Sequence, residues 1–583
     1  MFRARLVPLI AVLVALACAG TSQQARVAGP PTSTVIVSIV GTNDLHGGIL
    51  QRGDRGGLAL LGGYVANVRA ARARDGGGVL LLDAGDMFQG TLESNLNEGS
   101  SVINAYNTLG YAAAAVGNHD FDYGPAGPPA TPQKPDDDPR GALKARAAQA
   151  SFPLLAANLI DERTGRAVDW PNVRPSTTVT VAGIRIGIVG VMTARALSGT
   201  IAANVGGLRV APLAETVAAE ARQLRAGGAS IVVVTSHAGG RCTSFDSPTD
   251  LTSCIPDEEI MQVARALPPG LVDVIVAGHA HSGMAHLVAG IPIIESYNGG
   301  RTFGRVDLVI ERGSRRILEE RMFAPRDLCA RVDPGTTRCD PEGSSTARIR
   351  AEYEGAPVVP DPAVVKTIAP AVQAAESQKK MPLGVTLATP VRRAGSGDSP
   401  LGNLFADAYR AGAAGADVSV NNTSGGLRAD LPAGPLTYGA VFEVMPFDNR
   451  LVTFHLSGAE LRQVLQTQIS RNAALVGLSG IQARVTCERG RLNVGMLRPN
   501  GAPISDTERL LIATSDFLAT GGDNIFVPVT PAEGFVIQQD IGLVRDVVVE
   551  SLRKRGGTLR EDQLIDPANP RWVVPGKAPV TCK

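Results

Sequence analysis

Aromatic residues make up only 4% of this 583-residue chain, and the net charge at pH 7 is only +1. Near neutrality excludes a general field that would attract nucleic acid or an anionic membrane surface. We therefore expect no nucleic-acid polymer as a partner, and anions must be bound by local groups. The cysteines have no C-x-x-C spacing, so a cysteine-based zinc site is not indicated.

Long hydrophobic runs are missing beyond the first twenty residues, MFRARLVPLIAVLVALACAG. There, Arg3 and Arg5 precede an apolar run over 6–17 that is short for a membrane span and typical of an export signal. Cleavage before Cys18 would give a lipoprotein (signal 1–17), and cleavage after Ala19 a free protein (signal 1–19). We expect an exported chain that is periplasmic or lipid-anchored at the cell envelope, touching a membrane only through Cys18.

Besides Cys18, six cysteines remain after either cleavage, and an even number in an exported protein suggests disulfide bonds. Two local pairs are plausible and leave a third: Cys242–Cys254, Cys329–Cys339 and Cys487–Cys582. Six unpaired buried thiols are the alternative, which an exported context disfavours.

The length of the chain is too great for one hydrophobic core, so at least two domains are expected. Segments 64–74 and 214–225 have helical spacing, and they alternate with apolar runs typical of buried strands at 35–40, 79–82, 112–116, 184–189, 231–234 and 272–277. This alternation predicts an α/β domain of layered sheets and helices. A charged, turn-rich stretch over 313–360 and a helical pattern over 361–379 then precede a second set of strands.

Polar clusters directly follow the apolar runs of the first half: NDLHG at 43–47, DAGD at 83–86, GNHD at 117–120, SHAG at 236–239 and GHAH at 278–281. Because the carboxyl ends of strands in an open α/β sheet border one crevice, we expect these clusters to converge. They contain five of the seven histidines, and imidazole together with carboxylate suits zinc, manganese, iron or nickel. The pattern predicts a metal site. The other two histidines are predicted to be a surface residue, His286, and an ordinary strand residue, His455.

The motifs NDLHG, GDMFQG, GNHDFD, SHAGG and GHAH resemble those of the calcineurin-like metallophosphoesterases. Their order resembles the bacterial 5'-nucleotidase and UDP-sugar hydrolase family in particular. The resemblance implies a four-layer α/β/β/α sandwich over 34–312, a linker with a connecting helix over 313–384, and an α+β substrate-binding domain over 385–583. It also implies two divalent metal ions, such as zinc, manganese or iron.

Roles in this metal site follow from the same resemblance. One ion would be bound by Asp44, His46 and His281 and the other by Asn118, His237 and His279, with Asp86 bridging both. His119 would stabilise the transition state or act as an acid, held by Asp122, because a carboxylate on one ring nitrogen favours the imidazolium. Asp120 is left as a surface or supporting residue.

A second set of motifs lies in the C-terminal half: SPLGNLFADA at 399–408, NNTSGGLR at 421–428, PFDN at 446–449 and SDFLATGGDN at 515–524. Stacking of a base on an aromatic ring contributes about 1–3 kcal/mol, and an arginine can bind phosphate through two hydrogen bonds. These motifs resemble the 5'-nucleotidase C-terminal domain. The resemblance implies substrate contacts to the base from Phe447, Phe517 and Asn449, to phosphate from Arg428, and to ribose from Asp523.

Two departures from the family pattern concern phosphate recognition. A phosphate-binding arginine often found before the LGN motif is missing from 395–398, and Arg392 or Arg393 would replace it or be exposed charges. Thr423 and Ser424 stand where an asparagine is often found, with Asn422 one step away. Arg428 also has a structural alternative, an ion pair within its own domain, since Asp430 is close in sequence.

The sequence thus predicts an exported two-metal hydrolase that releases phosphate from nucleoside 5'-monophosphates, with nucleotide sugars or other nucleotides as further candidate substrates. The alternatives on the same scaffold are a 2',3'-cyclic-nucleotide phosphodiesterase and a thiosulfohydrolase. A surface binding protein with a vestigial site is the non-enzyme alternative. The paired Phe447 and Phe517 favour a substrate with a base. The presence of the complete set of predicted metal ligands argues against a vestigial site.

Overall fold

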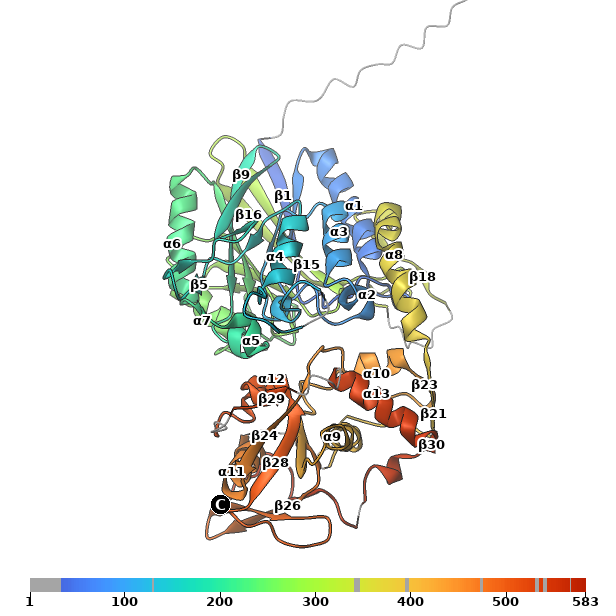
Figure 1. Ribbon diagram of the computed structural model, residues 1–583. Coiled ribbons are helices and arrows are strands. Elements are labelled where there is room, and N and C mark those ends of the chain that lie inside the picture. The colour runs from blue at the N-terminus through green and yellow to red at the C-terminus, as the bar shows by residue number, and fades with distance from the viewer. Residues whose placement is uncertain are drawn as a thin grey trace, which may run out of the picture.

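The computed structural model in Figure 1 describes residues 33–582 apart from 128–129, 340–346, 394–397, 472–474, 530–533, 538–542 and 567. The predicted export signal lies outside the described residues. Across the part of the chain that is described, no helix combines the length and the apolar character needed to cross a membrane. Figure 1 shows two bodies, one from the chain before helix α8 (Pro362–Lys379) and one from the chain after it, with α8 beside the N-terminal body.

Two mixed β-sheets form the centre of the N-terminal body. The first has the order β16-β15-β1-β2-β3-β4-β7 and the second β13-β14-β12-β11-β9-β8. The first sheet contains β1 (Thr34–Thr42), β2 (Gly78–Asp83), β3 (Ala113–Ala115), β4 (Leu154–Leu155), β7 (Val173–Arg174), β15 (Thr302–Glu311) and β16 (Ile317–Asp327). The second contains β8 (Ser176–Val181), β9 (Ile184–Met192), β11 (Ile231–His237), β12 (Val274–Ala277), β13 (Gly283–Val288) and β14 (Ile291–Ser296).

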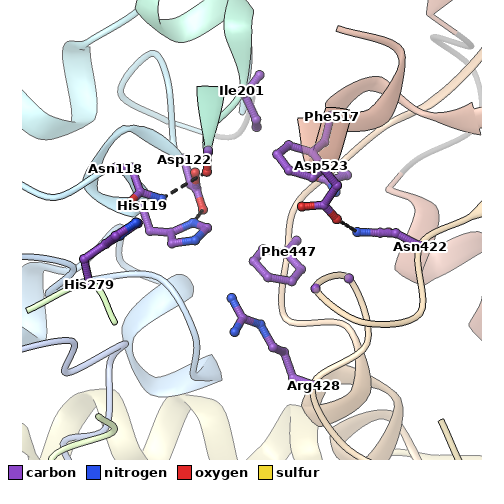
Figure 2. Close-up of a pocket in the computed structure, with 14 residues that line it drawn as sticks. Asn118, His119, Asp122, Ile201, His279, Asn422, Arg428, Phe447, Phe517 and Asp523 are labelled. Carbon is purple, nitrogen blue, oxygen red and sulfur yellow. Dashed lines mark hydrogen bonds and ion pairs between the residues drawn. The ribbon is translucent and has the colours of Figure 1, made fainter. Parts of the chain in front are cut away.

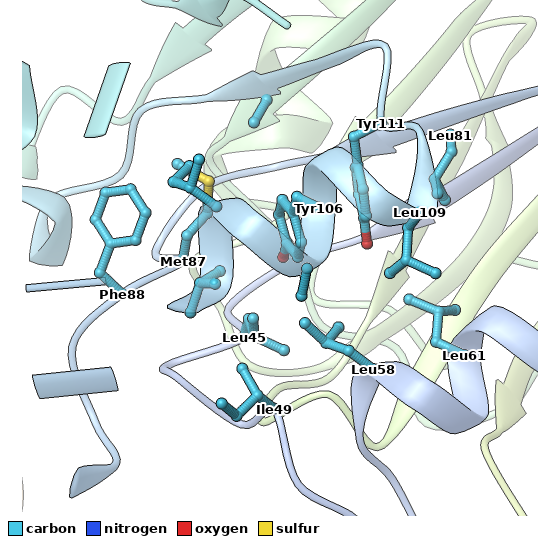
Figure 3. Packing of buried hydrophobic residues seen from close by; sticks show 14 of the residues in the cluster. Leu45, Ile49, Leu58, Leu61, Leu81, Met87, Phe88, Tyr106, Leu109 and Tyr111 are labelled. Carbon is cyan, nitrogen blue, oxygen red and sulfur yellow. The ribbon is translucent and has the colours of Figure 1, made fainter. Parts of the chain in front are cut away.

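Apolar side chains fill the space between and outside these sheets, which gives four layers. Between them lies a cluster that joins Ile39 of β1 and Leu80 of β2 to Ile186 of β9 and Val233 of β11. The outer face of the first sheet is covered by α1 (Leu58–Asp75), α3 (Ser100–Leu109) and α4 (Gly141–Gln149), in the cluster that Figure 3 shows. Helices α6 (Leu213–Ala226) and α7 (Glu259–Ala266) cover the second. The predicted α/β/β/α sandwich is confirmed, with all six predicted strands and both helices.

The stretch predicted as a linker from residue 313 starts with a strand of the N-terminal sheet. β16 pairs antiparallel with β15 and forms the edge of the first sheet. Consecutive charged residues, Glu319 to Arg321, leave this edge strand without an apolar alternation, and it is largely exposed. The connecting helix is found as α8, where the carboxylate of Asp361 accepts from the amides of Ala363 and Val364. The domain boundaries themselves stay predictions.

The C-terminal body is an α+β domain built on a five-stranded sheet of order β25-β22-β28-β24-β29. Its strands are β22 (Val418–Asn421), β24 (Leu451–Ser457), β25 (Gly477–Ser479), β28 (Arg509–Ser515) and β29 (Val536–Ile537). One apolar cluster contains α9 (Pro400–Gly412), α10 (Tyr438–Val444) and α13 (Val544–Arg555), and another contains α11 (Gly458–Arg471). Ser399 caps α9 by accepting from the amide of Gly402.

All three predicted disulfides are present: Cys242–Cys254, Cys329–Cys339 and Cys487–Cys582. The first lies beside the second sheet, the second precedes α8, and the third ties the C-terminal residues to β26 (Gln482–Glu488).

The segment after β2, which includes α2 (Leu92–Asn95), holds the two bodies together next to the DAGD motif. Gln89 Nε2 and Asn95 Nδ2 both donate to the carbonyl oxygen of Pro446, at 2.8 and 2.9 Å. Lys379 at the end of α8 pairs with Glu93 at 2.6 Å. The Pro446–Phe447 turn is therefore fixed against the loop that carries Asp86.

Candidate functional site

The five polar motifs of the N-terminal body converge at the carboxyl ends of their strands. Two groups of side chains have ligand atoms within 4.8 Å of one another, Asp44, His46, Asp86 and His281 in one and Asp86, His237 and His279 in the other. Asp86 is common to both groups. The structure thus brings the predicted ligands together in the predicted division, while their role as ligands stays a prediction.

Asn118 joins the second group, because its Oδ1 lies 3.0 Å from Nε2 of His237. Its Nδ2 donates to the carbonyl oxygen of Gly199 at 3.0 Å, which fixes the amide so that the oxygen faces the cluster. Nε2 of His237 is also 3.2 Å from Oδ2 of Asp86. In the first group, Nε2 of His281 is 3.1 Å from Oδ1 of Asp44.

Hydrogen bonds on the far side of the rings turn imidazole nitrogens toward the cluster. Nδ1 of His46 donates to the carbonyl oxygen of Gln89 at 2.9 Å, and Nδ1 of His237 donates to that of Ala84 at 2.8 Å. A backbone carbonyl can only accept, so Nε2 of each ring is left for the cluster, as in most histidine metal ligands.

The charges of this cluster fit metal ions. Nε2 of His46 is 3.0 Å from Nε2 of His281, and two imidazole nitrogens at this distance need a proton or a metal ion between them. Burial, reinforced by the nearby His281, lowers the pKa of His46 to about 3. Although burial opposes it, the carboxylate of Asp86 raises the pKa of His237 to about 10. Divalent cations can replace such protons, since binding by histidine and carboxylate releases them.

The backbone of these ligands is strained. Asp44, His46, Asp86, His279 and His281 have φ between 47° and 76°, a region that residues other than glycine rarely adopt. Such conformations cost on the order of 1–3 kcal/mol each and cluster at functional sites. Gly117 is needed for the same close packing, since a Cβ there would lie 2.2 Å from Oδ1 of Asp86.

Asp120 is a supporting residue rather than a surface residue. It is buried, and its two carboxylate oxygens accept from the amides of Met87 at 2.9 Å and Gly117 at 2.8 Å. It thereby joins the loop that carries Asp86 to the loop that carries Asn118 and His119.

His119 and Asp122 form a pair at the edge of the cluster, as Figure 2 shows. Nδ1 of His119 lies 2.7 Å from Oδ2 of Asp122, and Thr200 Oγ1 donates to the other oxygen at 2.9 Å. Burial favours the neutral ring, but the carboxylates of Asp122 and Asp86 outweigh it and raise the pKa of His119. The pair therefore favours the imidazolium.

A cavity of about 200 Å³ opens beside His119, between the two bodies (Figure 2). Its N-terminal wall includes Asn118, His119, Asp122 and His279, and its C-terminal wall includes Asn422, Arg428, Phe447, Asn449, Phe517 and Asp523. All five substrate residues predicted from the C-terminal motifs, together with Asn422, thus line one space next to the cluster.

Contacts within this wall place its aromatic and charged groups. The guanidinium of Arg428 lies 5.1 Å from the ring centre of Phe447, whose ring is 5.9 Å from that of His119. Asn422 Nδ2 donates to Asp523 at 2.5 Å. Asp430, the alternative partner of Arg428, instead accepts from the amide of Arg393 at 2.9 Å.

The two upstream arginines differ in position. Arg393 borders a second cavity, which it shares with Arg428 and His46, whereas Arg392 is exposed and lines neither cavity. Most of the stretch where the family arginine is missing lies outside the described residues.

The prediction for His286 is wrong: it is fully buried on β13, where its ring is 5.9 Å from that of Phe245. Its side chain faces inward because β13 pairs with β14. This pairing cannot be predicted from the apolar residues on both sides of His286 in the sequence. His455 lies on β24 with an exposed side chain, in the ordinary strand expected.

Sequence reasoning missed several supporting residues. Thr200 holds Asp122, and Asn298 Nδ2 lies 2.9 Å from Nδ1 of His281. Asn43 Nδ2 donates to Oδ2 of Asp44 at 2.7 Å. Only Asn43 carried a signal, since it stands inside the NDLHG motif; Thr200 and Asn298 are in loops without one.

Comparison with known proteins agrees with this geometry. Residues 375–530 match the family model of the 5'-nucleotidase C-terminal domain. The chain is 27% identical to protein UshA of Yersinia enterocolitica, over 85% of this chain and 88% of that protein. It is 25% identical to a 5'-nucleotidase of Vibrio cholerae, over 86% and 88%. The structure of a 5'-nucleotidase precursor from Thermus thermophilus superposes with a TM-score of 0.66 and 23% identity, over 90% of this chain and 97% of that one. The chain thus contains a match to the 5'-nucleotidase C-terminal domain and is similar over most of its length to UshA and 5'-nucleotidase proteins.

Proposed function

We propose that this protein is a two-metal phosphohydrolase that releases phosphate from nucleoside 5'-monophosphates, with nucleotide sugars and other nucleotides as further substrates. One observation carries the proposal: two imidazole–carboxylate groups that share Asp86 lie directly beside a cavity with two phenylalanines. The first feature supports phosphate chemistry and the second a substrate that carries a base.

In this proposal the ligands are those predicted, Asp44, His46 and His281 for one ion and Asn118, His237 and His279 for the other, with Asp86 between them. When bound, a pair of divalent ions lowers the pKa of a water molecule and neutralises the charge of phosphoryl oxygens. Zinc, manganese and iron all suit this donor set.

The residues of the cavity orient the nucleotide. Phe447 and Phe517 offer ring faces to a base, with Asn449 at its edge, and the carboxylate of Asp523 accepts hydrogen bonds from ribose hydroxyls. Arg428 reaches toward His119 from the opposite wall (Figure 2) and binds the phosphoryl group. Arg393 is the better candidate for the missing family arginine, since it lines the same cavity as Arg428, whereas Arg392 lines neither cavity.

His119 acts on the phosphoryl group from the N-terminal wall. As an imidazolium held by Asp122, it stabilises negative charge that develops on the phosphoryl oxygens, or donates the proton that the leaving nucleoside oxygen needs. Asp122 and Thr200 fix the orientation of the ring and favour its charged form.

Export is part of the proposal. The basic and apolar leader supports secretion, and three disulfides are typical of an oxidising compartment. A lipid anchor at Cys18 and free release into the periplasm are both compatible with the leader.

The test is phosphate release from AMP by the mature chain, before and after chelation and with divalent ions added back. We expect release that chelation abolishes, that added ions restore, and that His119→Ala reduces strongly. The control is His455→Ala, an exposed histidine on β24, which should release phosphate like the unchanged protein. Release that survives thorough chelation would refute the metal-dependent reaction. Metal binding without turnover would favour the vestigial binding protein.

A further inference from the structure

A third group of candidate metal ligands lies where the disulfide Cys242–Cys254 meets His286 of β13. The two sulfur atoms and one ring nitrogen of His286 all lie within 4.8 Å of one another, and all three residues are buried. None of the three lines either cavity of the cleft. Thiolate and imidazole are typical donors of zinc sites, so the group offers such a site once its sulfurs are thiols.

The imidazole of His286 is buried without a full set of hydrogen bonds. Its Nε2 has no partner within hydrogen-bond distance in the part of the chain that the structure describes, and Nδ1 lies 3.3 Å from the amide of Ala285. An unsatisfied buried polar atom costs about 1–3 kcal/mol, and a metal ion would satisfy this one. Burial lowers the pKa of His286, although the carbonyl oxygen of Ser244 and the carboxylate of Asp250 oppose the shift. The ring is therefore neutral at neutral pH, which is the form that binds metal ions.

The backbone keeps the two cysteines side by side without help from the bond between their sulfurs. Cys242 and Cys254 are partners in an antiparallel bridge. Next to them, the amide of Thr243 donates to the carbonyl oxygen of Ser253 at 3.2 Å. Reduction of the disulfide therefore leaves two thiols as neighbours.

The loop between the two cysteines is attached to β13, the strand that carries His286. The amide of Cys242 donates to the carbonyl oxygen of Gly283 at 3.3 Å, and the amide of Leu287 donates to that of Pro248 at 2.7 Å. These two hydrogen bonds lie on either side of His286 along the strand. The histidine therefore stays next to the cysteines when the bond between the sulfurs is broken.

The surroundings of this group favour a complex without net charge. Cys242 and Cys254 belong to the apolar cluster between the second sheet and helices α6 and α7, and the ring of Phe245 lies 5.9 Å from that of His286. A lone thiolate is costly here, because an apolar environment disfavours a charge. A divalent ion with two thiolates and a neutral imidazole has no net charge, and the ion itself deprotonates the thiols that bind it. The group thus suits zinc.

We propose that Cys242, Cys254 and His286 form a zinc site that becomes available when the disulfide is reduced. A dithiol reductant supplies two electrons and two protons and becomes a disulfide itself, while the bond between the two sulfurs breaks. Zinc then binds both thiolates and the imidazole, and two protons are released. The lack of C-x-x-C spacing does not exclude this site, because its third ligand comes from another part of the chain. The inference does not depend on the proposed function.

Alkylation of the thiols in the full chain, followed by mass spectrometry of its peptides, tests the site without any substitution. The chain is reduced with a water-soluble phosphine and treated with iodoacetamide, with and without zinc. We expect zinc to prevent alkylation of Cys242 and Cys254. Cys329 and Cys339 are the matched control, because they are an equally local pair that no histidine or carboxylate completes to a ligand group among the described residues. Their alkylation should not depend on zinc.

Equal alkylation of all four cysteines with and without zinc would overturn the proposal. This holds also where reduction has unfolded the chain, since a site that does not survive reduction cannot bind zinc. Protection of both pairs alike would overturn it as well, because the histidine would then make no difference.

Cobalt in place of zinc distinguishes this site from the candidate active site. A cysteine ligand gives a sulfur-to-cobalt charge-transfer band in the near ultraviolet, and the ligands predicted for the active site contain no sulfur. We expect the band in the reduced chain and not in the oxidised chain. His286→Gln should weaken the cobalt binding that this band reports by at least about 10-fold, since even residues that only orient metal ligands contribute this much.

The control for these spectra is the double variant Cys329→Ser and Cys339→Ser, which should keep the band at unchanged affinity. Loss of the band in that variant would show that the other pair binds the cobalt and would overturn the proposal. An unchanged affinity in His286→Gln would overturn it too, because the cysteines would then bind the metal ion without the histidine.

Discussion

The two walls of the site are built differently. On the N-terminal wall, the carboxylates of Asp44 and Asp86 and the ring of His237 are buried, held by hydrogen bonds to backbone groups, and carried at the ends of strands. On the C-terminal wall, Arg428 and Asp523 are exposed, Arg428 on a loop and Asp523 in a short 3-10 turn, Gly522–Asn524. We infer that the N-terminal wall determines the type of reaction. The C-terminal wall, whose loop residues tolerate substitution more easily, selects the substrate.

The largest effect is expected for the residue shared by both predicted ligand groups. Asp86→Ala should lower phosphate release from AMP and from a ring-free alkyl phosphate alike, on the order of 1,000-fold, because both proposed metal ions would lose a ligand. Metal content, measured by atomic emission after dialysis, should fall as well. Loss of activity toward AMP alone would show that the first wall also selects the substrate.

Asp120→Asn tests the supporting shell of the same wall. An asparagine offers one acceptor oxygen to the amides of Met87 and Gly117, so one amide would lose its partner and the two loops would move apart. We expect kcat/KM to fall about 10- to 100-fold for both substrates, the range typical of residues that orient metal ligands.

The matched control is Asp137→Asn, because Asp137 also accepts from two backbone amides, those of Gln133 and Lys134, but on an exposed loop. Kinetics of this variant should match those of the unchanged chain. Equal losses in the two variants would mean that Asp120 contributes only to general stability.

Phe517→Ala should separate the two walls. Loss of one stacking face costs about 1–3 kcal/mol, so kcat/KM for AMP should fall between about fivefold and 150-fold while release from the alkyl phosphate stays unchanged. Initial rates for both substrates, determined side by side over a range of concentrations, test this prediction. An equal loss of activity toward both substrates would show that Phe517 contributes to the reaction itself and that the two walls do not have separate roles.

The smallest effect concerns pH. Asp122 raises the pKa of His119, so the charged ring persists to higher pH than that of a free histidine. In Asp122→Asn the pKa falls, and the alkaline limb of the kcat profile should therefore move to lower pH. Thr200→Val, which removes one hydrogen bond to Asp122, should move it in the same direction by less. If the alkaline limb of the kcat profile does not move in Asp122→Asn, that limb reports the titration of another group.

The sequence was most informative where motif and secondary structure coincide. The six strands and the motifs that follow five of them were predictable, because polar clusters at the carboxyl ends of neighbouring strands meet at one edge of a layered sheet. The disulfides were predictable from local spacing and an even count. Edge strand β16 was not, because an exposed edge needs no apolar alternation.

What remained hidden depends on contacts between segments far apart in the chain. The burial of His286 follows from the pairing of β13, and the support of Asp122 by Thr200 spans 78 residues. The positive φ of five predicted ligands could not be read from residue types, since aspartate and histidine indicate this conformation much less strongly than glycine does. The partner of Asp430 likewise proved to be Arg393 rather than its sequence neighbour Arg428.

The central claim is that a metal-dependent reaction and a separate base-binding wall meet in one cleft. The most direct measurement follows phosphate release from AMP and from the ring-free alkyl phosphate side by side, before and after chelation, with the metal-loaded full chain. The account predicts that chelation abolishes both activities, that divalent ions restore both, and that AMP is strongly preferred. Equal rates for the two substrates, or release from AMP after the metal is removed, would contradict it.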